Sequence, residues 1–162
     1  MTQDSHSSHP LIPDSPLATF DIRLAKSNDA MDLAALLRQL GNDEPPMDVQ
    51  RLARYLAQTR KKTLTLLAER DGTLLGTCSL HLIEHIAHDF ARSAVLEDMV
   101  VDSRARGQGV GQALIRRAVE QAREWGCYKL ALSSHLQREA AHRFYAAMGF
   151  SVHGVSLSLP LD

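Results

Sequence analysis

The sequence contains few cysteines: Cys78 and Cys127 are the only two, and they are too far apart to form a CxxC pair. A disulfide framework is therefore excluded, and so low a cysteine content is typical of proteins in a reducing cytoplasm. The sequence also has no apolar run long enough to be a signal peptide or a membrane-spanning helix. We therefore expect a cytoplasmic protein that has no membrane partner.

An excess of one charge sign is missing as well. The 18 basic and 19 acidic residues are interspersed and give a formal net charge of −1. A protein that binds nucleic acid usually presents a clustered basic surface, because its affinity depends on contacts to phosphates. We therefore expect no nucleic-acid partner.

Residues 1–17 lack the periodic apolar positions that mark helices and strands. They are rich in Ser, His, Pro and Asp, and segments of such composition cannot bury enough apolar surface to fold alone. Residues 18–162 suffice for one domain with a full core, and their periodicity offers no point of division. We expect a disordered tail at 1–17 and a single domain at 18–162.

Apolar periodicity predicts strands and helices throughout residues 18–162. Strands are expected where apolar and polar residues alternate, and helices where apolar residues recur at intervals of three and four. The predicted elements are, in order, a strand at 19–25, helices around 33–40 and 49–56, strands at 63–69, 73–83 and 94–101, a helix at 110–125, a strand at 128–133, a helix at 137–148, and strands at 150–152 and 155–159. The order βααβββαβαββ indicates an α+β fold with a mixed central sheet flanked by helices.

Glycines occupy every second position at Gly107, Gly109 and Gly111, between the strand that ends at Val101 and the next helix. N–H groups at a helix start point outward and the helix dipole favours negative charge, so phosphate is the natural ligand. A Walker loop is excluded because the sequence has no Gly-Lys pair. A Rossmann fingerprint is disfavoured because Gln112 occupies the place of its third glycine. A tight turn without a ligand stays open.

The remaining pattern, R-x-x-G-x-G, is filled by Arg106, Gly109 and Gly111, and here the sequence resembles the GNAT superfamily of acyl-coenzyme A dependent N-acyltransferases. The resemblance also includes EDMVV at 97–101, RGQGVGQALI at the loop and helix, and AAHRFYAAMGF at 140–150. It implies the GNAT fold and acetyl-coenzyme A (acetyl-CoA) as co-substrate. It also implies that the backbone amides of residues 106–111 bind the pyrophosphate of the coenzyme.

The resemblance implies further coenzyme contacts. The strand that ends at Val101 is expected to separate from the next parallel strand, so that backbone groups of Met99 and Val101 bond to the pantetheine arm as an added strand would. Where many family members carry an asparagine that contacts pantetheine, this sequence has Arg138, whose longer side chain is expected to reach a phosphate. The implied coenzyme-binding residues are Met99, Val101, Arg106, Gly107, Gln108, Gly109, Val110, Gly111 and Arg138.

Tyr145 and Glu97 are the candidate catalytic residues. Tyr145 matches the family's tyrosine, and a phenol pKa of about 10 is near enough to that of a thiol for the phenol to protonate a leaving thiolate as general acid. The alternative is a core aromatic beside Phe144. Glu97 is the candidate general base, because by period two it shares a face with Met99 and Val101. A structural or substrate-orienting carboxylate, with a histidine or water as the base, stays open.

The residues from His81 to His85 spell H-x-x-E-H, the inverted zinc-protease motif, and His88 follows three residues on. That motif needs a helix to bring both imidazoles to one face, whereas the surrounding residues alternate as a strand does. We therefore expect no metal. These histidines form either a solvated hairpin end or part of the substrate mouth, where imidazole suits proton relay near neutral pH.

Together these features predict an acetyl-CoA dependent N-acetyltransferase that moves an acetyl group directly to a primary amine of a small molecule or peptide. The alternative is a non-catalytic acyl-CoA-binding regulatory or sensor module. The acceptor amine has no recognisable code in the sequence, although the loop residues Asp43 and Glu44 would attract a cationic amine. A monomer and a homodimer both stay open.

Overall fold

The computed structural model describes residues 20–41, 46–58 and 61–161. By the contacts between its residues the chain divides into two compact units, of which the larger runs from residue 17 to residue 133 and the smaller includes residues 134–161. Each unit is described by itself. The predicted tail at 1–17 lies outside the described residues, and the single domain at 18–162 stays a prediction.

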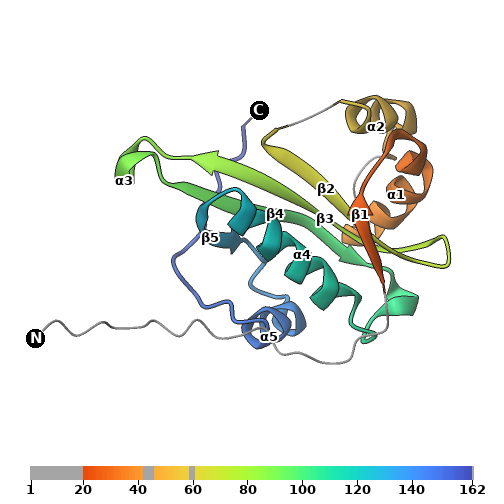
Figure 1. Ribbon diagram of the computed structural model, residues 1–162. Coiled ribbons are helices and arrows are strands. Elements are labelled where there is room, and N and C mark those ends of the chain that lie inside the picture. The colour runs from red at the N-terminus through yellow and green to blue at the C-terminus, as the bar shows by residue number, and fades with distance from the viewer. Residues whose placement is uncertain (1–19, 42–45, 59–60, 162) are drawn as a thin grey trace, which may run out of the picture. The chain divides into compact units, whose positions relative to one another are not determined.

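The larger unit is a mixed sheet whose strands are β1 (Asp21–Leu24), β2 (Thr63–Arg70), β3 (Thr73–Glu84), β4 (Arg92–Val101) and β5 (Cys127–Leu132). The strands lie in that order across the sheet (Figure 1). Strands β1 to β4 pair antiparallel, and β5 lies parallel to β4. The β2–β3 hairpin turns at Asp71 and Gly72, whose φ angles of +52° and +74° are those that an Asp-Gly hairpin turn requires.

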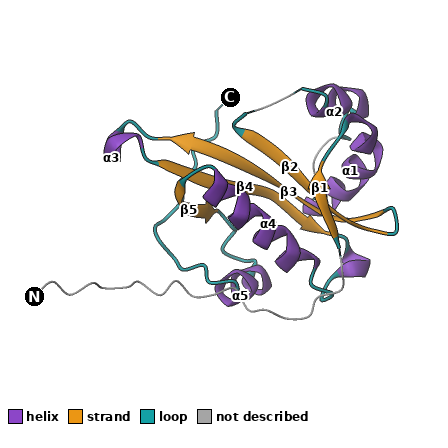
Figure 2. Ribbon diagram, in the orientation of Figure 1, coloured by secondary structure: helices purple, strands orange, loops and turns teal. Residues whose placement is uncertain are grey.

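The helices of this unit are α1 (Ala30–Leu37), α2 (Val49–Leu56), α3 (Ala87–Phe90) and α4 (Val110–Glu124), with 3-10 turns at η1 (Ser27–Asp29), η2 (Arg38–Leu40) and η3 (Ser103–Ala105) (Figure 2). The short α3, at the tip of the β3–β4 connection, is not a regular helix, because His88 and Asp89 have φ angles of +58° and +56°. None of the described helices is long and apolar enough to cross a membrane.

Both faces of the sheet are covered. Consecutive residues Leu66, Leu67 and Ala68 of β2 are at most 2 % exposed, and this requires cover on each side because successive side chains point to opposite faces. Helix α4 covers one face, where a Cβ added to Gly76 of β3 would lie 2.8 Å from Val110 Cγ1. Helix α1 contacts β3 and β4 from the other side (Figure 1). The unit is therefore a sheet with a helical layer on each face.

The smaller unit contains α5 (Glu139–Ala147), which matches the helix predicted at 137–148. Gly149 follows it with a φ of +89° and donates its N–H to Ala146 O at 3.0 Å. A glycine in the left-handed region commonly ends a helix in this way. The helix end in the signature AAHRFYAAMGF is therefore formed as the sequence predicts.

The two strands predicted at 150–152 and 155–159 are wrong, because residues 150–161 carry no strand. A strand exists only where its N–H and C=O groups pair with those of a neighbour, and Val152, Val155 and Leu157 are 97 %, 86 % and 90 % exposed. Their alternation indicates a segment suited to a sheet but supplies no partner for it. Apart from α3 and the 3-10 turns, the described chain has the order βααβββαβα, within the predicted α+β class.

Candidate functional site

The glycine-rich segment lies between the end of β4 and the start of α4, as the sequence predicts. Gly107 and Gly109 have φ angles of +75° and +89°, a left-handed conformation that costs other residues roughly 1–2 kcal/mol. Gly109 is also the N-cap of α4, and no side chain caps this helix end. The first N–H groups of α4 are therefore available to an anion, which the helix dipole also favours.

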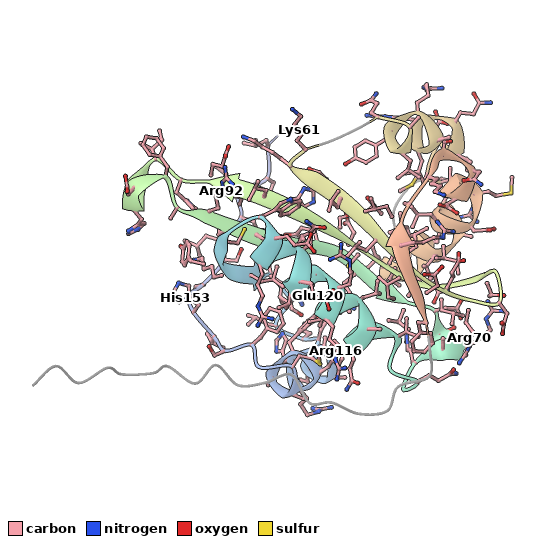
Figure 3. All side chains as sticks on the ribbon, viewed as in Figure 1. Lys61, Arg70, Arg92, Arg116, Glu120 and His153 are labelled. Atoms are coloured by element: carbon pink, nitrogen blue, oxygen red, sulfur yellow. The ribbon has the colours of Figure 1, made fainter. Side chains whose placement is uncertain are left out.

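The polar side chains of this loop bond back to the protein. Arg106 Nε donates to Val101 O at 3.4 Å, and Gln108 Nε2 donates to Arg104 O at 3.0 Å. Arg70 Nη2 donates to Gln108 Oε1 at 2.8 Å, from the β2–β3 turn at this end of the sheet (Figure 3). These contacts fix the path of the loop while the N–H groups at the start of α4 stay uncapped.

Asp102 anchors the start of the same loop. It is 6 % exposed, and its carboxylate accepts the Arg104 N–H at 2.9 Å and the guanidinium Nε and Nη2 at 3.0 Å each. The hydrogen bonds from Arg104 hold the pKa of this carboxyl well below its usual range. Gln39 in η2 adds a second tie, because its Oε1 accepts the Ser103 N–H at 3.0 Å and its Nε2 donates to Asp102 at 3.4 Å.

Neither of these two anchors, Asp102 and Gln39, was predicted from the sequence. The Asp-Ser-Arg order at residues 102–104 is a recognisable signal, because an aspartate often accepts the N–H of the residue two positions on. Gln39 carries no such signal, since its partner Asp102 lies 63 residues away in the chain.

Strand β4 continues beyond the end of its pairing with β5. The parallel pairing begins at Arg92 with Cys127 and ends at Leu96 with Leu132. In the described part of the chain, residues 97–101 of β4 pair only with β3. The pairing ends at Leu132, which is the last residue of β5. The separation that the resemblance implies, and the contacts of Met99 and Val101 with pantetheine, therefore stay predictions.

A β-bulge interrupts β4 within residues 97–101. Asp98 has a φ of +51°, and the pairing shifts so that Glu97 lies opposite Ser79 while Val101 lies opposite Gly76. The extra residue of a bulge reverses the alternation of faces. Because opposed residues share a face, Val101 faces α4 with Gly76, and Glu97 faces the other side.

The prediction that Glu97 shares a face with Met99 and Val101 is therefore wrong, because period two does not hold across the bulge. The carboxylate of Glu97 is exposed. Within the described chain it has neither an ion pair nor a hydrogen bond with a protein group. The bulge thus places a carboxylate without a partner on the side of the sheet opposite α4.

The histidine motif lies on β3 and the connection after it, not on a helix. His81 Nδ1 is 3.3 Å from Thr63 Oγ1, and His85 Nε2 is 2.8 Å from Ser93 Oγ. His88 lies in α3. Across the described ranges no three His, Cys, Asp or Glu residues are placed to hold a metal ion. The zinc-protease interpretation therefore lacks its helix, and His81 lies in the sheet two residues from the partner of Glu97.

Tyr145 and Arg138 belong to the smaller unit. The Tyr145 ring packs against Phe144 and Phe150, with centroids 5.4 Å and 5.8 Å away. Arg138 is the N-cap residue of α5, its N–H donates to His135 O at 2.9 Å, and its side chain is exposed. Their roles as general acid and coenzyme contact stay predictions, and the loop residues that sequence analysis offered for a cationic amine lie outside the described residues.

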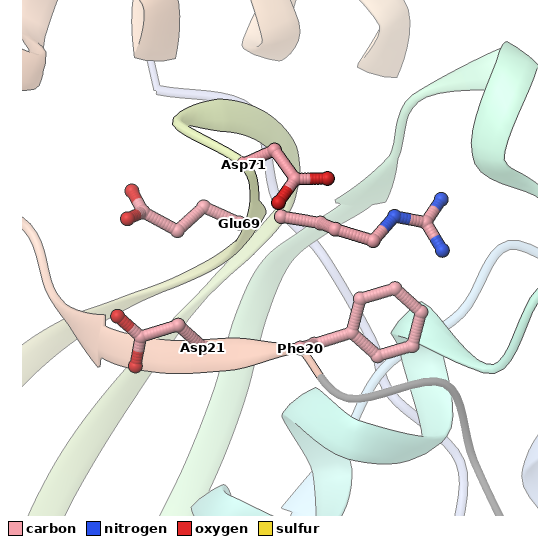
Figure 4. Close-up of a pocket in the computed structure, with 5 residues that line it drawn as sticks. Phe20, Asp21, Glu69 and Asp71 are labelled. Atoms are coloured by element: carbon pink, nitrogen blue, oxygen red, sulfur yellow. The ribbon is translucent and has the colours of Figure 1, made fainter.

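A hollow of about 520 Å³ opens beside β1 and the β2–β3 turn (Figure 4). Three of its five lining residues are acidic: Asp21, Glu69 and Asp71. Arg70 also lines it; its Cζ lies 5.3 Å from the centroid of the Phe20 ring, and its Nη2 donates to Gln108 in the glycine-rich segment. A phosphate would be repelled by three carboxylates, so the uncapped start of α4 is the better anion site.

Comparison with known proteins agrees with this geometry. A family model described as "Acetyltransferase (GNAT) family" matches residues 31–150. The glucosamine 6-phosphate N-acetyltransferase of Trypanosoma brucei brucei is 32 % identical over 135 residues, which are 80 % of this chain and 90 % of that protein. The aminoalkylphosphonate N-acetyltransferase of Salmonella typhimurium is 37 % identical over 84 residues, 52 % of this chain and 54 % of that protein. The crystal structure of a Trypanosoma brucei acetyltransferase superposes with a TM-score of 0.77 at 29 % identity, covering 88 % of this chain and all (100 %) of that one.

Proposed function

This chain belongs to the GNAT family of acetyltransferases, and from that premise we propose that its acceptor is a small primary amine that carries a phosphate or phosphonate group. The chain is an acetyl-CoA dependent N-acetyltransferase. The support for the acceptor is the chemistry that two relatives share: the substrates in their names, glucosamine 6-phosphate and aminoalkylphosphonate, each join an amine to a phosphorus oxyanion.

The residues of the β4–α4 loop fit the coenzyme. The observation that carries this assignment is the uncapped start of α4, which follows two left-handed glycines and suits a pyrophosphate. We assign the anion contacts to the backbone of residues 106–111, with Arg106 as the nearby cation. The end of the β4–β5 pairing at Leu96 supports a role for the backbone of Met99 and Val101 in holding the pantetheine arm.

Two side chains are assigned to proton transfer. When bound, acetyl-CoA supplies the acetyl group and a thiolate leaving group. An attacking amine must be neutral, so Glu97 accepts a proton from the acceptor's ammonium group, either directly or through water. Tyr145 donates its phenolic proton to the departing sulfur. The carboxylate of Glu97, which is exposed and has no ion pair or hydrogen bond within the described ranges, supports the first assignment, and the family's tyrosine position supports the second.

Glu97→Gln tests the base, because it keeps the shape of the side chain and removes its basicity. General-base groups contribute about 10²–10⁴-fold to a rate, so kcat should fall by at least about 100-fold while the Kd of acetyl-CoA stays the same. Glu120→Gln on the exposed side of α4 is the matched control and should keep wild-type kcat. A Glu97→Gln variant with wild-type kcat would exclude Glu97 as the base.

The competing function is a sensor module that binds acetyl-CoA without turnover. Calorimetric titration with acetyl-CoA, with NADH and a nucleoside triphosphate as controls, establishes the coenzyme site in either case. Thiol release on addition of glucosamine 6-phosphate or an aminoalkylphosphonate separates the two functions. Selective binding together with amine-dependent thiol release supports the enzyme, and binding without release by any amine of a panel supports the sensor.

We also propose that the protein forms a homodimer. The support is the row of apolar residues after α5, which are 82–97 % exposed: Val152, Val155, Leu157, Leu159 and Leu161. Soluble monomers rarely expose so contiguous an apolar segment, and an alternating segment that pairs with no strand among the described residues suits pairing with another chain. Light scattering should give about twice the chain mass of 17.9 kDa. Leu157→Asp should return the mass of one chain, and a wild-type mass of one chain would refute the dimer.

A further inference from the structure

The face of the sheet opposite α4 changes character along its strands. Opposed residues of β2, β3 and β4 share a face and form rows across the sheet. The first row consists of Leu67, Thr77 and Val100, which are 0 %, 1 % and 6 % exposed. The Thr77 hydroxyl in this row is satisfied by Leu66 O at 2.9 Å. This part of the face is therefore closed core.

The next two rows are polar. They contain Thr65, Ser79 and Glu97 in one row and Thr63, His81 and Val95 in the other. We call Thr63, Thr65, Ser79, His81 and Glu97 the polar face; the first four are half-buried and the last is exposed. Inner strands of a covered sheet normally carry apolar side chains, so polar groups from three neighbouring strands at one place indicate a surface for a polar ligand.

A hollow adjoins the polar face. It has a volume of about 240 Å³ and lies between the end of α2 and the start of β2. Thr63 and Thr65 line it and also belong to the polar face, while Tyr55 and Leu56 form its wall on the α2 side. Sites that enclose a drug-sized ligand have volumes of about 300–1,000 Å³, so this hollow suits a smaller molecule.

Two side chains of the polar face have hydrogen-bonding atoms without a partner in the described chain. His81 uses Nδ1 toward Thr63 Oγ1 at 3.3 Å, and in the described chain its Nε2 has no hydrogen-bond partner. Glu97 is likewise without a partner among the described residues. His81 is the diagonal neighbour of Glu97 across β3 and β4, a separation of about 7–8 Å. One small ligand can therefore contact both side chains.

The bulge in β4 directs the side chains of Val101 and Glu97 to opposite faces of the sheet. Val101 faces α4 with Gly76, whereas Glu97 belongs to the polar face on the opposite side of the sheet. The pairing of β5 with β4 ends at Leu96, next to Glu97. A coenzyme that binds along β4 beyond Leu96, as proposed above, therefore presents its acyl end to an acceptor bound on the polar face.

We infer that the polar face and the hollow beside it bind the acceptor, and that the acceptor is a hydroxylated amine of the amino-sugar class. This inference rests on the proposed acetyl transfer. Thr65, Ser79 and His81 bind the hydroxyl groups of the acceptor, and Glu97 receives its ammonium group. The polar face presents uncharged hydrogen-bonding groups and a single carboxylate. That combination suits a polyhydroxylated ring better than a lysine side chain on a cationic peptide.

Thr65→Val and Ser79→Ala test the inference, since each removes one hydroxyl at nearly constant shape. Thr73→Val, at an exposed position of the same strand as Ser79, is the control. A lost neutral hydrogen bond corresponds to an increase of about 3- to 10-fold in KM for glucosamine 6-phosphate. KM for acetyl-CoA should stay within twofold of wild type. With an aminoalkylphosphonate, which has no ring hydroxyls, the same variants should keep the wild-type KM.

The outcomes separate the inference from the proposed function. If the wild-type protein releases thiol but both variants keep the wild-type KM for glucosamine 6-phosphate, the inference is overturned while the proposed function stands. An equal rise of KM for both acceptors and for acetyl-CoA overturns it as well, because it indicates a general structural effect. Wild type that acetylates no amine overturns the proposed function. In that case glucosamine 6-phosphate is titrated into the CoA-saturated protein. Binding to wild type that both variants weaken supports the polar face as the acceptor site. If the wild-type protein does not bind the sugar, that assignment is overturned.

Discussion

Gly76→Ala is expected to destabilise the fold and to weaken acetyl-CoA binding at the same time. Gly76 lies in β3 beneath the first turn of α4. A Cβ added there would lie 2.8 Å from Val110 Cγ1 and 3.1 Å from Leu114 Cδ1. It would also lie 3.2 Å from Val100 O on the neighbouring strand. Since real Cβ atoms do not approach another atom to 2.8 Å, the Val110 side chain must shift. Valine in a helix has one strongly preferred rotamer, so we expect the start of α4 to move with it.

The magnitude follows from two opposing effects. Overpacking of this kind costs about 1–3 kcal/mol, and replacing glycine by alanine returns about 0.4–1 kcal/mol by restricting the unfolded chain. We therefore expect the free energy of unfolding to fall by about 1.3 kcal/mol, which is the difference between the centres of the two ranges. Val110 is the first residue of α4, so the same movement displaces N–H groups of the anion site. A loss of about 1 kcal/mol in their bonds to the pyrophosphate raises the Kd of acetyl-CoA about fivefold.

Urea unfolding followed by circular dichroism measures the first effect, and calorimetric titration with acetyl-CoA measures the second. Gly41→Ala is the matched control, because Gly41 has a φ of −164° and nothing lies within 4 Å of an added Cβ. Val110→Ala in the Gly76→Ala background removes the closest contact and should restore the Kd. A Gly76→Ala protein with the wild-type urea midpoint and the wild-type Kd would refute the reasoning.

Three further predictions concern single groups. Gly109→Ala should lower the free energy of unfolding by about 1–2 kcal/mol, because Gly109 has a φ of +89°; an unchanged urea midpoint would contradict the left-handed cap. Burial raises the pKa of the Cys78 thiol to about 12. Cys78 should therefore resist an alkylating reagent at pH 8 in the folded protein and react once urea unfolds it. Fast labelling of the native protein would contradict this burial. The Arg23 hydrogen bonds lower the pKa of Asp29 in the folded state. A carboxyl group of this kind stabilises the fold at a pH above its unfolded-state pKa. It loses that contribution as the pH falls through its folded-state pKa. Asp29→Asn should therefore flatten the decline of stability below about pH 4, and a decline as steep as in wild type would contradict the pairing.

The parts of the fold that sequence alone predicted depend on local signals. The Asp71-Gly72 turn, the left-handed Gly109 at the start of α4 and the left-handed Gly149 after α5 each form where the residue type demands them. The strands and helices in residues 63–148 follow from apolar periodicity, which a covered sheet and its helices impose directly. Local chemistry was sufficient there because each signal and its structure lie within a few residues.

The features that were not predicted from the sequence depend on partners that are distant in the chain. The bulge at Asp98 reverses the face of Glu97. No glycine or proline at the bulge predicts it from the sequence, because its cause is the register between β3 and β4. Gln39 anchors Ser103 across a separation of 64 residues. The segment after Gly149 alternates as a strand does, but pairing is a property of two segments, and no pattern within one of them specifies the other.

The most direct test of the account is the reaction of the purified protein with acetyl-CoA and glucosamine 6-phosphate, followed by thiol release and by mass spectrometry of the sugar. The account predicts one equivalent of free thiol for each N-acetylated product, with release that depends on the amine and falls in Glu97→Gln. Tight binding of acetyl-CoA without thiol release for glucosamine 6-phosphate, an aminoalkylphosphonate or any amine of the panel would contradict catalysis. The chain would then be a coenzyme sensor rather than an acetyltransferase.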